Sequence, residues 1–380
     1  MFRVARHRPL VVVSPQPWFP GQSLIRWLRP GYRPQAPARE IQQGIEVYYP
    51  RFLSIPGLLR RLDGWSMALG SLLLMKRLRS EGARLIDAHF AYPDGEAATR
   101  LGRWLGMPVT ITLRGTEVPH SKNPVLRPRL ARALQEAAHV FSVSDSLRRL
   151  AVALGVADQK TEVVGNGVDI SRFQPMNRAE ARGRHALPAD ARVLISVGGL
   201  VERKGIHRVI DCLPALLEHY PDLHYLVVGS GSPEGDMRDQ LTAQVSRLGL
   251  TGHVHFLGAV PPDELKWPLS AADVFVLSTR NEGWANVFLE AMACGLPVVS
   301  TDVGGNAEVV CRDELGIIVP FGDASALREA LAAALARSWN RDVIMAYAAA
   351  NQWDMRVAQL LHAFERLAPA SSPVREATVK

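Results

Sequence analysis

The sequence predicts an α/β protein with two domains, each built on a mostly parallel sheet covered by helices. The chain has 380 residues, and domains of about 100–200 residues are usual, so two domains are expected. Short apolar segments alternate with amphipathic segments along most of the chain, which is typical of βα units. This series starts a second time near residue 192, which indicates two Rossmann-like domains that face each other across a cleft.

Both halves of the chain are expected to contribute several strands. Those of the first half are at residues 10–13, 46–49, 85–88, 109–113, 140–143 and 162–164, with helices at 96–105 and 130–138 among them. Those of the second half are at residues 192–197, 224–228, 254–257, 274–277, 297–300 and 317–319. A polar stretch at 166–191 with several turn-forming residues separates the two series. We therefore assign residues 1–168 to an N-terminal domain, 169–345 to a C-terminal domain, 346–368 to a C-terminal helix and 369–380 to a disordered tail.

The composition indicates a globular protein of a reducing compartment. Hydrophobic residues make up 47% of the chain and charged residues 21%, which is enough to build sizeable cores. The three cysteines are far apart in sequence and match no disulfide framework or zinc site, which favours the cytoplasm. No apolar run reaches the roughly 18 residues of a membrane-spanning helix, and the run at 9–14 is too short for a secretory signal.

Charge is distributed unevenly along the chain. Residues 1–163 contain 24 Lys and Arg against 12 Asp and Glu, whereas the remainder contain 20 against 25. The basic half is expected to face an anionic partner, either nucleic acid or a phospholipid surface, unless the excess is only a compositional bias. Segment 58–79 has basic ends around an apolar run, so it either covers the first sheet as a helix or lies in a membrane interface. Segment 18–33 is a second candidate for the membrane contact.

Two carboxylates carry the clearest chemical signal. Glu282 follows the predicted strand at 274–277, and open α/β sheets bind ligands at the carboxyl ends of their strands. Glu290 lies eight residues after Glu282, in a predicted helix that ends at Gly295. Along a helix, eight residues span about 12 Å. Carboxylates accept hydrogen bonds from paired hydroxyls, so one can hold a sugar and the other the ribose of an extended donor. The plain alternative is two solvent-facing helix charges, although the apolar neighbours of Glu290 make an unpaired carboxylate costly there.

Lys204 and a pair of glycines are suited to a diphosphate. Lys204 is a compact cation beside glycines, and such a cation stabilises a departing diphosphate. Gly304 and Gly305 precede a predicted helix at 306–311, where exposed amides bind phosphate and the missing Cβ lets the ligand approach. Each feature alone has an ordinary alternative, namely a solvated lysine at a helix start and a simple βα turn.

The motifs, taken in the order in which they occur along the chain, resemble those of the retaining glycosyltransferases of family 4, which have the GT-B fold. The spacing Glu-x7-Glu is followed by Ala-Met-Ala-x-Gly-x-Pro-Val-Val at 291–299, as in the family. Further segments resemble, in order, two acceptor-side loops of members that act on envelope polysaccharides (88–95 and 112–117), the hinge turn (166–169), the first phosphate loop (197–205), two donor-pocket strand ends (228–231 and 256–258) and the loop under the pyrophosphate (302–308). The resemblance covers most of residues 85–365, and the ordered set is specific although each motif alone is weak.

The resemblance implies a division of roles between the domains. The N-terminal domain would bind the acceptor, the C-terminal domain would bind the nucleotide-sugar, and the C-terminal helix would pack back on the N-terminal domain. The residues implied in catalysis are Glu282, Lys204 and Arg114. Those implied in donor binding are Glu290, Gly198, Gly199, Arg203, Gly229, Gly231, Gly258, Arg280, Gly304, Gly305 and Asn306. Those implied in acceptor binding are His89, Asp94, Gly95 and Glu117, with a structural role for His89 and a solvated loop position for Glu117 as the alternatives.

Two positions depart from the family pattern. The family has a basic residue where Gly199 stands, so a second phosphate-binding cation must come from elsewhere, with Arg203 and Arg280 as candidates. The family often has His where Arg114 stands, and an arginine cannot act as a general base, although it can pair with a diphosphate or an acidic sugar. Retaining members need no protein base if the departing phosphate accepts the acceptor's proton. The change at Arg114 therefore bears on the sugar more than on the reaction class.

The sequence thus predicts a glycosyltransferase that moves a sugar from a nucleotide diphosphate, UDP- or GDP-linked, to a lipid-linked or polysaccharide acceptor in cell-envelope or exopolysaccharide synthesis. We expect a cytoplasmic enzyme, peripheral at the inner membrane face, whose partners are the donor, the acceptor and an anionic membrane surface. No Asp-x-Asp follows a predicted strand, so neither a metal nor a cofactor is expected. A nucleotide-sugar 2-epimerase of the same architecture is one alternative. A nucleic-acid-binding protein is another, disfavoured because the basic half has no helix-turn-helix, RRM-like or zinc pattern.

Overall fold

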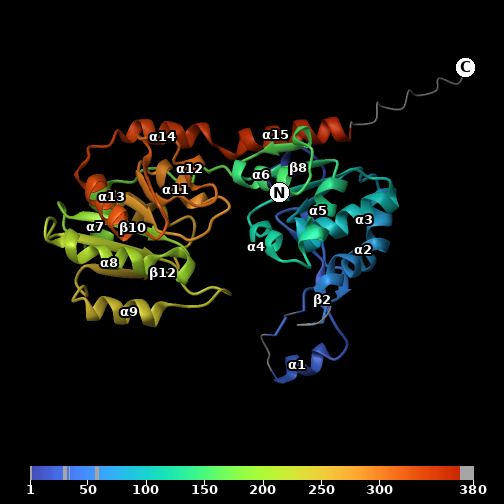
Figure 1. Cartoon of the computed structure of the whole chain (residues 1–380), viewed down its shortest axis with the longest axis horizontal. Coiled ribbons are helices and arrows are strands. Elements are labelled where there is room, and N and C mark those ends of the chain that lie inside the picture. Colours follow the sequence, from blue (N-terminus) through green and yellow to red (C-terminus); the bar gives the residue numbers. More distant parts are fainter. Residues whose placement is uncertain (1, 29–31, 34, 56–59, 369–380) are drawn as a thin grey trace, which may run out of the picture. The chain divides into compact units, whose positions relative to one another are not determined.

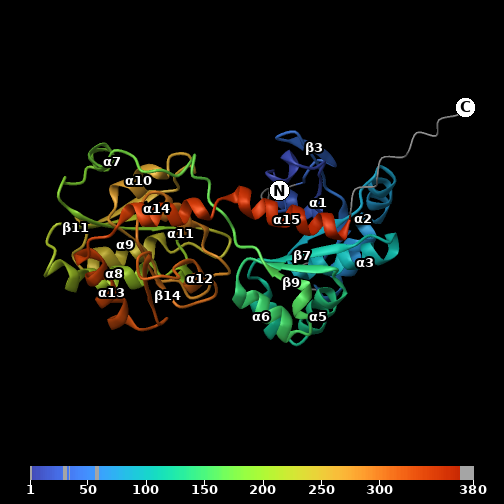
Figure 2. The same cartoon turned by 90° about the horizontal axis from the view of Figure 1, so that it is seen from above.

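The computed structural model describes residues 2–28, 32–33, 35–55 and 60–368, and the tail predicted at 369–380 lies outside them. The chain forms two compact units (Figures 1 and 2). The first unit combines Met1–Val164 with the segment that begins at Val357, and the second is Gly165–Arg356. The first boundary therefore lies four residues before the position assigned from the sequence, and the segment that returns to the first unit begins inside the last helix.

The second unit is built on a single parallel sheet. Its strands are β10 (Arg192–Val197), β11 (Leu223–Val228), β12 (Val254–Gly258), β13 (Val274–Leu277), β14 (Val298–Thr301) and β15 (Gly316–Val319). They lie in the order β12-β11-β10-β13-β14-β15, and every pair is parallel. Numbered along the chain this is the 3-2-1-4-5-6 order of the Rossmann fold, whose order reverses between its first and fourth strands. The reversal places β10 and β13 side by side at the centre of the sheet.

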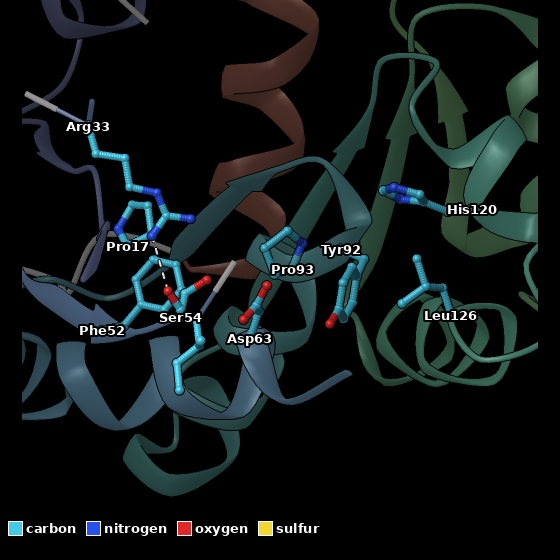
Figure 3. A pocket seen from close by; sticks show the side chains of 10 residues that line it. Pro17, Arg33, Phe52, Ser54, Asp63, Tyr92, Pro93, His120 and Leu126 are labelled. Carbon is cyan, nitrogen blue, oxygen red and sulfur yellow. Dashed lines mark hydrogen bonds between the residues drawn. The ribbon is translucent and has the colours of Figure 1, made fainter. Parts of the chain in front are cut away.

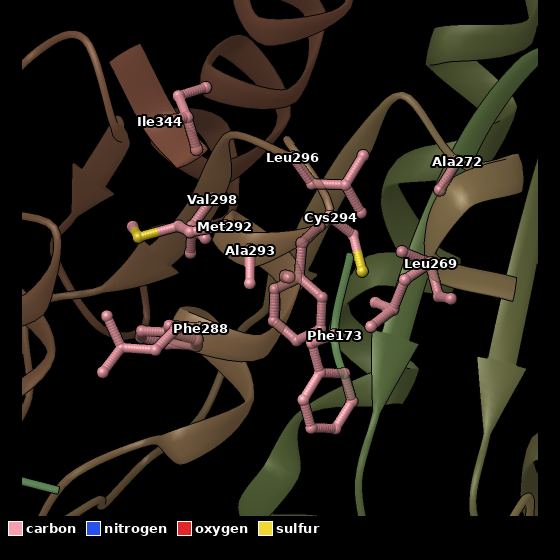
Figure 4. Close-up of a cluster of buried hydrophobic side chains, with 14 of the residues drawn as sticks. Phe173, Leu269, Ala272, Phe288, Met292, Ala293, Cys294, Leu296, Val298 and Ile344 are labelled. Atoms are coloured by element: carbon pink, nitrogen blue, oxygen red, sulfur yellow. The ribbon is translucent and has the colours of Figure 1, made fainter. Parts of the chain in front are cut away.

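Helices cover both faces of this sheet because successive strand residues point to opposite sides. The helices are α7 (Arg178–Arg184), α8 (Ile206–Leu217), α9 (Arg238–Arg247), α10 (Lys266–Ala271), α11 (Asn286–Ala293), α12 (Asn306–Val309), α13 (Ala324–Ala336) and α14 (Arg341–Ala350), with a 3-10 turn η5 (Glu202–Lys204). Ile195 of β10 belongs to a core formed with α7, α10, α11 and α14, part of which is drawn around Phe288 and Met292 in Figure 4. Leu194 belongs to the opposite core, formed with α8, α9 and α13. The fully buried sheet holds the loops at its carboxyl edge in place.

The first unit contains three small sheets. A four-stranded parallel sheet has the order β6-β7-β8-β9, with β6 (Ile86–His89), β7 (Val109–Leu113), β8 (His139–Ser142) and β9 (Thr161–Val163). A second sheet has the order β1-β4-β3, with β1 (Val11–Val13), β4 (Ile45–Tyr48) and β3 (Arg39–Gln42), and a third pairs β2 (Gln16–Trp18) with β5 (Arg51–Leu53). The sequence did not predict β2, β3 and β5, because they are only three or four residues long and none contains more than two apolar residues, so no apolar run marks them.

Most helices of the first unit bury an apolar face on these sheets or on one another. They are α1 (Gln22–Leu28), α2 (Asp63–Ser80), α3 (Glu96–Leu105), α4 (Glu117–Lys122), α5 (Arg127–Glu136), α6 (Asp145–Ala153) and part of α15 (Trp353–Leu367), with short turns η1 (Val4–Arg6), η2 (Arg60–Leu62), η3 (Ala91–Gly95) and η4 (Asp158–Lys160). Helix α2 packs against α3 and β5, so segment 58–79 does include a covering helix. Ala363 and Phe364 of α15 pack with Phe141 of β8 and with Val164. Among the described residues, no helix has the length and apolar character needed to cross a membrane. The predicted α/β class with two Rossmann-like units is confirmed.

Candidate functional site

The candidate site of the second unit lies where the strand order reverses. The loop after β10 contains Gly198, Gly199 and the turn η5, and the loop after β13 runs from Ser278 to Ala285. Because β10 and β13 are adjacent and parallel, both loops leave the same edge of the sheet. This reversal point is where open α/β sheets bind their ligands.

Glycines allow the loops at this edge to touch. Gly205 has φ +75°, and a Cβ there would lie 1.8 Å from the carbonyl oxygen of Ser278. Gly304, in the loop after β14, has φ +56°, and its Cβ would lie 1.6 Å from the carbonyl oxygen of Glu282. Both positions therefore exclude every side chain, for steric and conformational reasons. The three loops after β10, β13 and β14 are consequently in direct backbone contact.

One carboxylate oxygen of Glu282 receives three donors. Lys204 Nζ lies 2.5 Å from Oε1, Arg203 Nη1 lies 3.2 Å from it, and the Thr279 hydroxyl donates to it over 3.3 Å. The side chains of Lys204 and Glu282 are 17% and 11% exposed, so water screens this pair only weakly. Within the described part of the chain, Oε2 of Glu282 makes no hydrogen bond. That oxygen is available to accept a hydroxyl from a ligand.

Arg203, one of the two candidates for the cation missing at Gly199, lies beside Lys204 at Glu282. Its guanidinium forms two bonds to Glu234, of 2.8 Å from Nε and 2.7 Å from Nη2, while Nη1 reaches Glu282. Arg280 instead pairs with Glu202 at 3.1 Å, although its backbone N–H donates to the Arg203 carbonyl. Arg203 therefore lies with Lys204, whereas the guanidinium of Arg280 is engaged on the Glu202 side of the loop.

In the phosphate loop predicted at 304–306, the backbone amides of the two glycines differ from that of Asn306. Among the described residues, the backbone N–H groups of Gly304 and Gly305 have no acceptor, so they can donate to an anion. The backbone N–H of Asn306 already donates to Val303, over 3.1 Å. Its buried side chain donates to Ser300 Oγ and to the Thr301 carbonyl. Asn306 ties this loop to β14, and it cannot offer its amide to a ligand without giving up that bond.

Glu290 lies on α11 and does not contact Glu282. Burial raises the pKa of its carboxyl to about 7, and the positive charge of Arg172 opposes that shift. In the described part of the chain no hydrogen bond or ion pair reaches this carboxylate. A half-buried acid without a partner is costly to ionise, which fits a residue that receives its hydrogen bonds from a bound ligand.

The remaining predicted donor residues lie towards the β12 edge of the sheet. Gly229 follows β11 with φ +143°, and a Cβ there would lie 1.8 Å from the Gly198 carbonyl oxygen. Its backbone N–H donates to the carbonyl of Gly258, which ends β12, and two strands separate β12 from β13. Gly231 packs against Asp236, whose side chain a Cβ would strike at 2.6 Å. Gly229 therefore shapes the β10 loop, whereas Gly231 and Gly258 are not in contact with Lys204 or Glu282.

In the first unit, His89 and Arg114 meet at the carboxyl ends of β6 and β7. Arg114 Nε donates to His89 Nδ1 over 3.3 Å, and His89 Nε2 lies 3.6 Å from Asp87 Oδ2. Thr110 donates to the other oxygen of Asp87 over 2.7 Å. Burial lowers the pKa of His89, and the Arg114 cation lowers it further while Asp87 opposes the shift. A neutral imidazole with its proton on Nε2 satisfies both contacts.

Glu117 is neither a solvated loop carboxylate nor a free acceptor ligand, so both interpretations of it are wrong. Its side chain is buried and accepts hydrogen bonds from the backbone N–H groups of Ala91, Arg114 and Gly115, at 2.9 to 3.2 Å. It thereby joins the loops after β6 and β7.

Gly95 is also a packing position, because a Cβ there would meet the Ile111 side chain at 2.9 Å. Burial raises the pKa of Asp94 in the same turn.

A cavity of about 370 Å³ opens beside these loops (Figure 3). It is lined by Pro17, Arg33, Phe52, Ser54, Ile55, Asp63, Tyr92, Pro93, His120 and Leu126. Arg33 donates to the Ser54 carbonyl over 3.0 Å, and the Tyr92 and His120 rings meet edge to face. Burial raises the pKa of Tyr92 to about 12, so its hydroxyl keeps its proton. The cavity thus combines apolar walls with the Arg33 cation, the Asp63 carboxyl, the Tyr92 hydroxyl and the His120 imidazole.

Several of these residues were not found from the sequence. Asp87 could have been, because strand residues two apart share a face and place Asp87 beside His89. Glu234 and Arg172 gave no such signal, since they reach Arg203 and Glu290 only through the fold. No group of three or more His, Cys, Asp or Glu side chains with metal-binding geometry occurs among the described residues.

Two family models match the chain, one to each half. "Glycosyltransferase Family 4" matches residues 5–172, and "Glycosyl transferases group 1" matches residues 177–352. A relative in Bacillus subtilis, the putative teichuronic acid biosynthesis glycosyltransferase TuaC, is 32% identical over 85% of this chain and 79% of its own length. A GDP-mannose-dependent phosphatidylinositol monomannoside mannosyltransferase of Mycolicibacterium smegmatis is 35% identical over 60% of this chain and 61% of its own.

Solved structures share the fold at lower identity. Sucrose-phosphate synthase from Thermosynechococcus elongatus superposes with a TM-score of 0.72 at 23% identity, covering 88% of this chain and 86% of its own. The Anabaena protein HepE, solved in complex with UDP, superposes with a TM-score of 0.70 at 20% identity, covering 84% and 86%. With a relative matched at this level over most of both chains, and with family models on both halves, the chain belongs to the family 4 glycosyltransferases and has their GT-B fold.

Proposed function

We propose that this chain is a retaining glycosyltransferase that moves a sugar from a nucleotide diphosphate to a lipid-linked or polysaccharide acceptor in envelope synthesis. The observation that carries the proposal is the cluster of Lys204, Arg203 and Glu282 at the strand-order reversal of the second unit. It combines two cations with one carboxylate whose second oxygen is available. A diphosphate needs the cations, and the sugar beside it needs a hydrogen-bond acceptor.

Each donor group has a residue suited to it. Lys204 and Arg203 would move from Glu282 Oε1 to the phosphate oxygens, and the Gly304 and Gly305 amides would add two neutral donors. Glu282 would orient the sugar, and Glu290 would accept the ribose hydroxyls. UDP or GDP is the expected carrier, since HepE was solved with UDP and the Mycolicibacterium relative is named for GDP-mannose. We expect the donor to bind without a metal or cofactor.

The proposed transfer needs no protein base. The bond from the anomeric carbon to the phosphate oxygen breaks, and the acceptor hydroxyl attacks from the same face. Its proton passes to the departing phosphate, because Arg114 is already protonated at neutral pH and cannot accept it. Lys204 and Arg203 stabilise the negative charge that develops on the diphosphate. The residues of the chain therefore position the groups and stabilise charge, which are usually the largest contributions in such reactions.

The cavity of the first unit is the proposed acceptor site. Phe52, Pro17 and Leu126 provide apolar walls, Arg33 provides a cation that can pair with an anion, and Asp63 provides a carboxyl that can accept sugar hydroxyls. An amphipathic anion, such as the phosphorylated head of a lipid-linked saccharide, has both characters. The names of the relatives support this class of acceptor, since one acts in teichuronic acid synthesis and another on a phosphatidylinositol mannoside. His89, Asp94 and Arg114 are the proposed contacts at the neighbouring loops.

An anionic membrane surface at the inner face of the membrane is the proposed location of the acceptor. On α2, the side chains of Trp65, Leu69 and Leu73 form an exposed stripe, and Leu73 is 81% exposed. Exposed cations lie near both ends of the helix, at Arg61 and Lys76. Leu24, Trp27 and Leu28 of α1 are also exposed. Apolar side chains flanked by cations are typical of interfacial helices.

The first prediction concerns the cation that replaces the one missing at Gly199. Arg203→Gln should lower kcat/KM for the nucleotide-sugar by about 10²-fold, as loss of a charge-assisted donor at a developing charge does. Gly199 has no positive φ, and a Cβ there meets Ser232 only at 3.6 Å, so a side chain fits. Gly199→Arg in the Arg203→Gln background should therefore recover part of the activity. Steady-state kinetics of the unmodified chain, of Arg203→Gln and of the double variant measures both changes in kcat/KM.

The control for this prediction is Arg247→Gln, at an exposed arginine of the same unit. It should leave kcat/KM unchanged. Full activity of Arg203→Gln would show that Lys204 acts alone at the diphosphate and that Arg203 only secures the Glu234 loop.

The second prediction concerns pH. With the pKa of Glu290 at about 7, lowering the pH from 8 to 6 protonates this carboxyl and weakens its bonds to the ribose. We expect the Kd of the better-binding diphosphate, UDP or GDP, to rise as pH falls through 7. Glu290→Gln should raise Kd by about tenfold at pH 8 and should flatten the pH profile to that of the ligand's own ionisation.

The same pKa has a consequence for stability. The pKa of Glu290 in the folded chain lies above its ordinary value of 4.5, so the folded state binds more protons between the two values. The free energy of unfolding should therefore fall as pH rises from about 4.5 through 7. Glu290→Gln should lessen that fall in urea titrations. Parallel pH profiles of the variant and the unmodified chain would contradict the assignment of the shift to Glu290.

The third prediction tests the membrane surface. Trp65→Gln with Leu73→Gln should reduce binding to vesicles that contain phosphatidylglycerol by at least about tenfold, because the two side chains no longer enter the interface. The matched control, Trp104→Gln with Val152→Gln, changes exposed apolar residues on α3 and α6 of the same unit. Equal losses in both pairs, measured by vesicle sedimentation, would mean that α2 is not the docking surface.

A further inference from the structure

A second, smaller cavity lies at the opposite edge of the large sheet. Its volume is about 90 Å³, and it is lined by Arg192, Asp273, Pro297, Ala334, Leu335, Arg337, Trp339 and Arg341. Arg192 is the first residue of β10, and Asp273 and Pro297 directly precede β13 and β14. Strand β10 has six residues, so at about 3.3 Å per residue the donor loops lie roughly 20 Å away. This cavity is therefore separate from the candidate donor site.

The one carboxylate in this lining is already occupied. Asp273 pairs with Arg178 through one oxygen and with Arg182 through the other, the latter at 3.1 Å. The second oxygen also accepts the backbone N–H of Val193 over 2.8 Å. All of these partners lie on α7 or β10 rather than at the arginines of the lining. Asp273 is consequently committed to holding α7 against the sheet.

Arg192 and Arg341 are left without a counter-charge. In the described part of the chain neither guanidinium makes a hydrogen bond or an ion pair. Burial lowers the pKa of Arg341, and the neighbouring Arg178 cation lowers it further, with Asp273 opposing. Burial lowers the pKa of Arg182 as well, and the negative charge of a second acid, Asp190, opposes this shift. Arg341 is half-buried and Arg192 is exposed, so water screens the charge of Arg341 less than that of Arg192, and both guanidinium groups can pair with an anion.

The wall of the cavity is held in a defined position. The Trp339 indole donates to the Ala334 carbonyl over 2.8 Å, and the Arg337 guanidinium lies 4.2 Å from the centre of the indole ring. This stacking fixes a third cation at the mouth of the cavity. Arg341 begins α14, whose first turn Asn340 caps. Three arginines from β10, the α13–α14 connection and α14 therefore converge.

We propose that this cavity binds a phosphate dianion, either inorganic phosphate or the phosphate of a small monoester. Arginine forks match the geometry of a tetrahedral oxyanion better than that of a spherical ion such as chloride. The volume is well below the ~300 Å³ at which pockets for small organic ligands begin, so a whole nucleotide-sugar is excluded. The site does not depend on the proposed glycosyl transfer, and either can fail without the other.

The test is a calorimetric titration of the full chain at constant ionic strength, with inorganic phosphate in one arm and glycerol 1-phosphate in the other. Arg192→Gln and Arg341→Gln should each weaken phosphate binding at least tenfold. Arg247→Gln, an exposed arginine outside the cavity, should not. Lys204→Gln should also retain the binding, which separates this cavity from the donor loops. Equal affinity for both ligands identifies a monoester site, and binding of inorganic phosphate alone identifies a site for the free anion.

Two outcomes would overturn the proposal. One is unchanged phosphate affinity in Arg192→Gln, which is decisive because this exposed side chain makes no bond that folding requires. The other is complete loss of binding in Lys204→Gln, which would assign all the phosphate to the donor loops. Circular dichroism of Arg341→Gln distinguishes a lost site from a misfolded chain, and Arg192→Gln decides the matter if that variant does not fold.

Discussion

The loops at the carboxyl edge of the large sheet meet at one oxygen atom, Oε1 of Glu282, with which both Lys204 and Arg203 pair. The two cations come from the loop after β10 and the carboxylate from the loop after β13, so the contact exists only because these strands are neighbours. Backbone contact at Gly205 and Gly304 holds the loops at that distance. The arrangement keeps two positive charges together without a ligand, since a carboxylate lies between them. It also leaves Oε2 free, so the same side chain that stabilises the cations can receive a hydroxyl.

The two edges of the large sheet are organised in different ways. At the carboxyl edge, glycines remove side chains and let backbone amides approach a ligand. At the amino edge, several arginines lie near Asp273, which forms ion pairs with the two on α7 and none with those of the cavity lining. Gly199 is one of the glycines at the carboxyl edge. The absence of the family's basic residue at this position is compatible with the proposed donor binding. Arg203 lies four residues later, in the turn η5, and pairs with the carboxylate of Glu282 as Lys204 does.

Much of the fold was predictable because buried parallel strands are continuous apolar runs that the sequence shows directly. The same local logic located Glu282, Lys204 and Gly304, since each follows a strand and the carboxyl ends of the strands share one edge. Strands β2, β3 and β5 were missed because their sequences are too short to carry such a run. Asn306 and Glu117 were misread for a different reason. A sequence shows that a residue is polar and close to a loop, but not whether backbone groups elsewhere have already taken its hydrogen bonds.

The account is tested most directly by a calorimetric titration of the purified chain with UDP, GDP, ADP and CDP, without added metal. It predicts that one diphosphate binds tightly and that Lys204→Gln, compared with Arg247→Gln, weakens that binding by at least about tenfold, as expected for a charge-assisted contact. It also predicts that the other three diphosphates bind more weakly, because a nucleotide site selects its base. A folded chain that binds none of the four, or a Lys204→Gln variant that binds as the unmodified chain does, would contradict the central claim.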